Sequence, residues 1–140
     1  MKLKKTVCFS INSFTQALET ISICKQSKII PILYIRYFLI NGFGIDWIKE
    51  LRIMLLEKFS KNEFRLFIDT RKNYGLFISL VEEKIDYIKV NASIHNLKKL
   101  RQISNLNKVL INPNISVVDL FRTQNISKKI KRIIQEINEN

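Results

Sequence analysis

The chain has 140 residues, enough for one domain, and 46% of them are hydrophobic while only three are Gly and two are Pro, which excludes intrinsic disorder. The formal net charge of +12 favours a phosphate-rich partner: a nucleic acid, an anionic membrane surface or a phosphorylated metabolite. His95, Cys8 and Cys24 do not have the spacing of a zinc site, so we expect buried free cysteines, no metal site and no cofactor.

Five short apolar runs alternate with segments of helical periodicity along the chain. Apolar runs without polar alternation are typical of parallel strands buried on both faces, and the helical segments between them predict βα units. We therefore predict an α/β fold of four to five parallel strands with alternating helices, either half of a TIM-type barrel or an open flavodoxin-like sheet. The runs span residues 6–11, 29–35, 64–68, 85–90 and 109–111.

Polar residues mark several predicted helix starts. Asn12 and Ser13 follow the first run, and Ser13 with Gln16 matches a capping box. Asn73 is placed to cap the helix after the third run, and Pro113 ends the fifth run.

The segment between the second and third runs contains two glycines, Gly42 and Gly44. Because glycine permits unusual backbone angles, we predict a loop over residues 37–44. Asp46 then caps a helix whose apolar stripe begins at Trp47.

The last segment, about residues 127–138, is a basic amphipathic helix in a single α/β domain over residues 1–140. Docking on the rest of the domain is the main expectation for this helix, and contact with a membrane surface or nucleic acid is the alternative. The segment most similar to a membrane span contains Pro31, Arg36 and Asp46, so we predict no span and a cytoplasmic protein. The isoleucines in register are Ile130, Ile133, Ile134 and Ile137.

Polar and basic residues follow the predicted strands directly. Since the carboxyl ends of parallel strands meet at one edge of a sheet, these side chains gather there, beside helix N-termini that attract anions. We expect a site for a small phosphorylated ligand; the alternative is a set of solvated loop residues. The ligand-binding residues are Asn12, Arg36, Arg71 and Lys72.

Asp69, directly after the third run, is the candidate catalytic residue. A carboxylate there can act as a general base, a metal ligand or a phosphate acceptor, and it can equally cap the next helix or pair with Arg71. Lys89, in the fourth run, can serve Schiff-base chemistry if it faces inward and is desolvated, although a lysine with its ammonium in solvent is commoner.

Three segments together resemble class II fructose-bisphosphate aldolases and their tagatose relatives. Residues 10–18 (SINSFTQAL) with 30–33 (IPIL) resemble the opening of that family, residues 44–51 (GIDWIKEL) its next helix, and residues 66–75 (LFIDTRKNYG) its Leu-Asp-His-Gly segment. The resemblance covers roughly residues 7–90 and implies the first half of an eight-unit barrel. It places Asp69 at the family's catalytic aspartate and Thr70 at a zinc-ligand histidine, which implies the scaffold without the zinc.

We therefore expect a non-catalytic, aldolase-like domain that binds a small anionic ligand at the carboxyl edge of the strands. The first alternative is a basic accessory protein that binds nucleic acid through residues 2–5, 98–101 and 128–132. The second is a metal-independent lyase or aldolase-like enzyme that uses Asp69. Open sheet edges also favour a homodimer.

Overall fold

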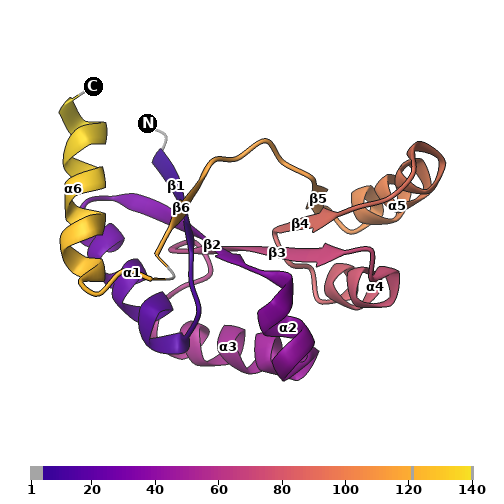
Figure 1. Cartoon of the computed structure of the whole chain (residues 1–140), viewed down its shortest axis with the longest axis horizontal. Coiled ribbons are helices and arrows are strands. Elements are labelled where there is room, and N and C mark those ends of the chain that lie inside the picture. The colour runs from indigo at the N-terminus through magenta and orange to yellow at the C-terminus, as the bar shows by residue number, and fades with distance from the viewer. Residues whose placement is uncertain (1–4, 121, 140) are drawn as a thin grey trace.

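The computed structural model describes residues 5–120 and 122–139 and has the α/β fold that the sequence predicts. In this part of the chain six parallel strands form one sheet in the order β5-β4-β3-β2-β1-β6 and alternate with six helices (Figure 1). The strands are β1 (Lys5–Ser10), β2 (Ile29–Ile35), β3 (Arg65–Arg71), β4 (Tyr87–Val90), β5 (Leu110–Ile111) and β6 (Val117–Asp119). The helices are α1 (Phe14–Gln26), α2 (Tyr37–Phe43), α3 (Ile45–Lys58), α4 (Tyr74–Glu82), α5 (Ile94–Leu106) and α6 (Ile126–Glu139).

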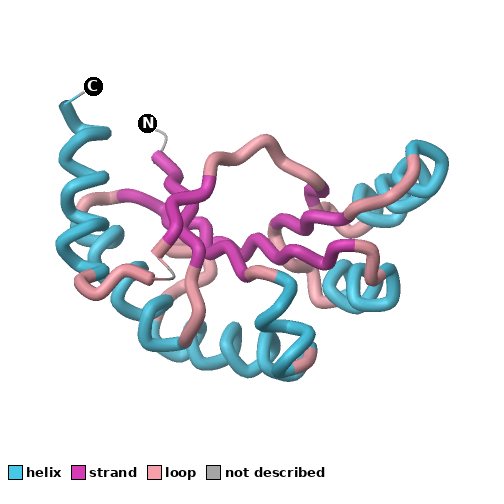
Figure 2. The backbone as a smooth tube through the Cα atoms, viewed as in Figure 1, coloured by secondary structure: helices cyan, strands magenta, loops and turns pink. Residues whose placement is uncertain are grey.

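Strands β2 to β5 each lie beside the preceding strand, as consecutive strands do in a barrel, whereas the flavodoxin order would place β3 next to β1. Right-handed crossovers that advance in one direction put the helices on one face, and the helices surround the outside of the curved sheet (Figure 2). We call the opposite face the inner face. It carries Cys8, Ser10, Ile32, Tyr34, Phe67, Asp69, Tyr87 and Lys89.

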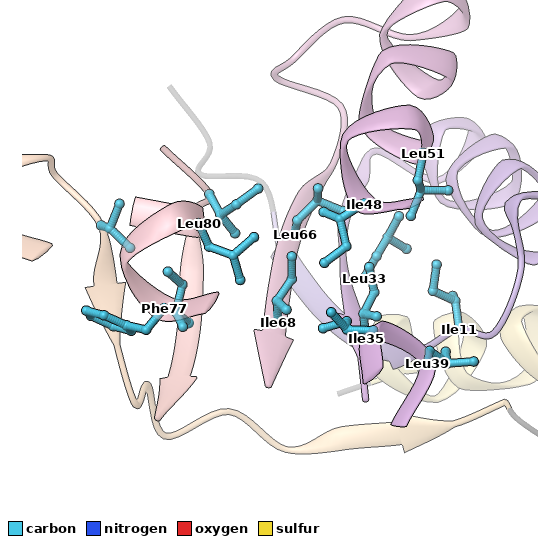
Figure 3. Close-up of a cluster of buried hydrophobic side chains, with 14 of the residues drawn as sticks. Ile11, Leu33, Ile35, Leu39, Ile48, Leu51, Leu66, Ile68, Phe77 and Leu80 are labelled. Carbon is cyan, nitrogen blue, oxygen red and sulfur yellow. The ribbon is translucent and has the colours of Figure 1, made fainter. Parts of the chain in front are cut away.

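The main hydrophobic core lies between the sheet and its helices. Leu33 and Leu66 point from β2 and β3 toward Ile48 of α3, while Phe77 and Leu80 project from α4 (Figure 3). All five side chains are buried. These residues occupy alternate strand positions and one helix stripe, which explains why the apolar periodicity predicts both kinds of element.

The helix α6 docks against α1 over a second apolar cluster. Ile126, Ile130 and Ile134 of α6 are buried there against Phe9 and Ile23. At the other end of the helix, Lys5 Nζ donates to the carbonyl of Ile137 at 3.5 Å. No helix in the described ranges is both long and apolar enough to cross a membrane.

The predicted loop over residues 37–44 is wrong, because Tyr37–Phe43 forms α2. Leu39 and Ile40 are buried in the main core, and this tertiary packing overrides the low helix propensity of Gly42. Gly44, at φ +84°, then ends α2 and is the N-cap of α3. The prediction that Asp46 caps α3 is wrong. The helix begins earlier than predicted, so Gly44 takes the N-cap position and Asp46 lies in the first turn.

The strand β6 was not among the predicted strands. Its three residues pair in parallel with β1, with Cys8 beside Val117 and Ser10 beside Asp119. The connection from β5 to β6, residues 112–116, contains no helix and arches from one end of the sheet to the other (Figure 1). A run this short, without helical periodicity before it, carries no strand signal of its own.

The other two predicted caps, Ser13 and Asn73, are confirmed. The Ser13 hydroxyl accepts the N–H of Gln16 at 3.1 Å, and the Asn73 side chain accepts the N–H of Leu76 at 3.0 Å. Cys8 and Cys24 are free and buried, as predicted, and burial raises the pKa of both thiols to about 12.

Candidate functional site

A layer of polar side chains crosses the inner face near the carboxyl ends of the strands. In the strand register Ser10 lies beside Asp119, and Asp69 lies beside Lys89. Ligands of parallel α/β sheets bind at this end of the strands. The contacts within this layer therefore determine which side chains are available to a ligand.

Asp69 is half-buried and engages both carboxylate oxygens within the protein. Its Oδ1 accepts the backbone N–H of Arg71 at 2.9 Å, and its Oδ2 accepts the hydroxyl of Tyr34 at 3.2 Å. The strand register shifts between Asp69 and Arg71, and Arg71 has a φ of +49°. Asp69 therefore shapes a β-bulge and positions Tyr34, and it does not cap α4, whose N-cap is Asn73.

Tyr34 lies at the centre of this layer as a hydrogen-bond donor. Burial raises its pKa to about 12, and the negative charge of Asp69 and the hydrogen bond to it act in the same direction. The phenol is therefore protonated near neutral pH.

Arg36 forms an ion pair with the last strand. Its Nη2 lies 3.0 Å from Oδ2 of Asp119, whose Oδ1 accepts the Ser10 hydroxyl at 2.9 Å. The Ser10 hydroxyl in turn accepts the N–H of Leu120 at 3.2 Å. This chain of contacts holds β6 against β1, so an anion at Arg36 would compete with Asp119.

The other predicted ligand-binding residues lie apart from this chain of contacts. The Arg71 guanidinium stacks 5.3 Å from the centre of the Tyr37 ring, and Lys72 is exposed. The backbone N–H of Asn12 donates to the Gln16 side chain at 2.8 Å. Asp69 meets Arg71 through the backbone N–H of Arg71, not through its guanidinium.

An open cavity of about 370 Å³ lies on the inner face. Tyr34 and Phe67 line it from the sheet, and Ile115 lines it from the arching connection. Lys89 and the exposed Asn91 also line it, at the carboxyl end of β4. The cavity combines an apolar wall with a cation and an amide.

A second hollow, which we call the basic groove, lies along α6 and has a volume of about 880 Å³. The exposed side chains of Lys128, Lys131, Arg132 and Gln135 share one helix face at positions i, i+3, i+4 and i+7. The groove is lined by Thr123, Asn125, Ser127, Lys128, Lys129, Lys131, Arg132 and Gln135. All of these side chains can donate a hydrogen bond to an anion.

The described residues contain no group of three or more His, Cys, Asp or Glu that could hold a metal ion. Thr70, which the aldolase resemblance aligns with a zinc ligand, is buried and donates from Oγ1 to the Lys89 carbonyl at 2.8 Å. Its side chain closes the bulge in β3 by linking it to β4. Asp69 and the neighbouring Thr70 therefore both make hydrogen bonds that stabilise the fold.

Sequence reasoning missed Tyr34, Asp119 and Ser10 as members of the polar layer. The signal for Tyr34 was its place in the second run, two positions before Arg36 on the same side of the strand. Asp119 had no such signal, because β6 was not predicted.

No protein-family model matches this chain, and no curated protein matches it in sequence. Its function therefore has to be inferred from the chemistry of these surfaces.

Proposed function

We propose that the protein binds nucleic acid through the phosphate backbone, using the basic groove of α6. The observation that carries this proposal is the gathering of four cations, Lys128, Lys129, Lys131 and Arg132, around one hollow. Lysine, arginine, serine, threonine, asparagine and glutamine are the side chains that contact phosphates in protein–nucleic acid complexes. The groove is lined by these residue types alone.

The position of the cations within the helix supports an anionic partner. Lys128 and Lys129 lie in the first turn of α6, where the helix dipole is already positive, and Lys131 and Arg132 lie in the second; the first turn contains no acidic residue. Lys129 is held by the backbone carbonyl of Asp119 at 2.6 Å. The exposed side chains of Lys128, Lys131 and Arg132 are three and four residues apart, so their like charges repel one another in the isolated protein. Binding of phosphates would neutralise these charges and remove that repulsion.

The docking of α6 argues against insertion into a membrane. An amphipathic helix enters a bilayer interface with its apolar face, and in this protein Ile126, Ile130 and Ile134 are buried against the domain. The basic face alone remains available. It suits a charged polymer rather than a lipid interior.

The groove lining contains no aromatic side chain. Base stacking on aromatic rings is therefore not expected to contribute, and the contacts that remain are to phosphate and sugar, which carry no direct sequence information. We expect binding that depends weakly on sequence and strongly on salt.

The test is fluorescence anisotropy with labelled single-stranded RNA and duplex DNA over a series of salt concentrations. If three exposed cations each neutralise one phosphate, log K falls against log salt with a slope of about −2 for single strands and about −3 for duplex DNA. Replacing Lys128, Lys131 and Arg132 together by Gln should remove most of the binding and flatten this slope.

The matched control replaces Lys98, Lys99 and Arg101 of α5 by Gln, which removes the same net charge. The helix α5 lies at the opposite end of the sheet from α6 (Figure 1). Equal loss of affinity in both variants would mean that α5 contributes as much as α6, through direct contact or through net charge, and would overturn the proposal of a groove on α6. The third predicted basic segment, residues 2–5, lies outside the described residues except for Lys5.

The resemblance to class II aldolases is retained as a proposal about the scaffold. The consecutive order of β1 to β5 supports a barrel-like arrangement. If Asp69 carries lyase chemistry, a screen for cleavage of phosphorylated ketoses should detect turnover that Asp69→Asn abolishes while the circular dichroism spectrum is unchanged. Turnover that persists in Asp69→Asn would exclude Asp69 as the base.

A further inference from the structure

We infer a second, separate binding site: the cavity on the inner face takes a small organic anion, whose charged group meets Lys89 and whose apolar body packs on Tyr34, Phe67 and Ile115. The inference does not depend on the basic groove of α6. It differs from the site predicted from the sequence, since none of Asn12, Arg36, Arg71 or Lys72 lines this cavity.

The placement of Lys89 carries the first step. In β4, Ile88 and Val90 are buried in the main core, so the alternate positions Tyr87 and Lys89 face inward. Lys89 lines the cavity, and its ammonium group has no hydrogen bond or ion pair within the described residues. Its neighbour in the register, Asp69, binds Tyr34 and Arg71 instead.

The wall that Tyr34 and Phe67 form beside Lys89 on the inner face is apolar and held in place. Tyr34 and Phe67 pack edge to face with ring centres 5.0 Å apart, and Asp69 fixes the Tyr34 hydroxyl. Phe67 also packs against Tyr87, at 6.1 Å between ring centres. A preformed wall of this kind binds the apolar part of a ligand without first paying to order its side chains.

The arching connection completes the cavity and is anchored at its start. The Asn112 side chain accepts the N–H of Val90 at 2.8 Å and donates to the Val90 carbonyl at 3.1 Å, so its amide extends the pairing of β4. Asn112 adopts a φ of +48°, a conformation that asparagine tolerates well. Beyond this anchor, Asn114 and Ile115 line the cavity from the side opposite β3 and β4.

Size and charge define the class of ligand. A volume of about 370 Å³ lies at the lower end of the range for small-molecule sites. One unpaired cation matches one anionic group, either a carboxylate or a phosphate monoester. Asn91 and Asn114 can donate to the remaining oxygens of such a group.

The experiment titrates the full chain with benzoate, phenyl phosphate, benzamide and inorganic phosphate, followed by NMR shifts of labelled protein. We expect saturable shifts at cavity residues with benzoate or phenyl phosphate. Benzamide, which has no charge, and inorganic phosphate, which has no apolar body, should bind at least about tenfold more weakly. The benzoate and phenyl phosphate arms decide between a carboxylate and a phosphate ligand.

Two variants locate the binding. Lys89→Gln should lower the affinity about tenfold, whereas Lys61→Gln, which removes an exposed lysine outside the cavity, should leave it unchanged. Ile115→Ala should weaken binding of the aromatic anions, because it removes part of the apolar wall. The inference is overturned if neither aromatic anion saturates at millimolar concentration, if Lys89→Gln binds as tightly as the unaltered protein, or if benzamide binds as tightly as benzoate.

Discussion

At the scale of single residues, the burial of Tyr34 and its interaction with Asp69 make the fold less stable at alkaline pH. The phenol has a pKa of about 12 in the folded protein and about 10 in the unfolded chain, so the folded state holds its proton more tightly. This contribution is complete below about pH 10 and is lost as the pH rises toward 12. Tyr34→Phe should cost about 1 kcal/mol at pH 8 through the lost hydrogen bond.

Urea unfolding of the unaltered protein and of Tyr34→Phe measures the unfolding free energy of each at pH values from about 8 to about 11. This range brackets the pKa of about 10 of a tyrosine in an unfolded chain. The difference in unfolding free energy between the unaltered protein and Tyr34→Phe should narrow as the pH rises, because only the unaltered protein has this proton to lose. A difference that stays constant across the range would show that the hydroxyl is not linked to folding.

Residue-level prediction from sequence succeeded at two helix caps, where the signal is local. Ser13 and Asn73 cap helices within four residues of themselves, so their roles follow from the sequence around them. The partner of Asp69 is 35 residues away, and the side of β4 on which Lys89 lies follows from strand register. Neither can be derived from spacing alone, which is why the sequence locates polar residues at the carboxyl ends of the strands but does not predict their contacts.

At the scale of elements, α6 holds its position through one buried stripe. Ile130 is fully buried, so Ile130→Ala should destabilise the protein by about 3 kcal/mol, through lost transfer free energy and the cavity that remains. Because the basic groove lies on the same helix, the variant should also bind nucleic acid more weakly. Urea unfolding and anisotropy measure the two effects.

The control for this prediction is Asn138→Ala, an exposed position later in α6 that does not line the basic groove. It should change the unfolding free energy by less than about 0.5 kcal/mol. A loss of stability equal to that of Ile130→Ala would show that the helix, and not its apolar stripe, is the sensitive feature.

The sequence predicts the strands that alternate with amphipathic helices, because the spacing of apolar residues differs between a strand and a helix and both spacings can be read along the chain. It does not predict α2 or β6. The helix α2 is short and contains Gly42, so only burial of Leu39 and Ile40 in the folded core favours it. The strand β6 depends on pairing with β1, more than 100 residues away along the chain.

At the scale of the whole molecule, the sheet ends in two open edges, β5 and β6. Open edges favour the homodimer expected from the sequence, but we expect the pairing to be weak, because β5 offers two residues and β6 three, and short edge strands limit pairing between molecules. The net charge of +12 also opposes association at low salt. Sedimentation velocity at micromolar and millimolar concentrations, in low and high salt, measures the fraction of dimer.

A dimer that persists at micromolar concentration in low salt would contradict this expectation. It would point to a larger interface than the strand edges provide. The exposed apolar side chains of α3, Ile53 and Leu56, would then be the first positions to replace.

The two hydrophobic clusters draw on different stretches of the chain. The larger uses residues between Ile11 and Ile111, whereas the smaller joins Phe9 to side chains beyond Leu120. On the ribosome, where N-terminal parts emerge first, the larger cluster can therefore consolidate while β1 still has a vacant flank. The nascent chain therefore exposes the apolar side of this second cluster, which includes Phe9, until α6 emerges. During this interval it is most prone to aggregate and most in need of a chaperone.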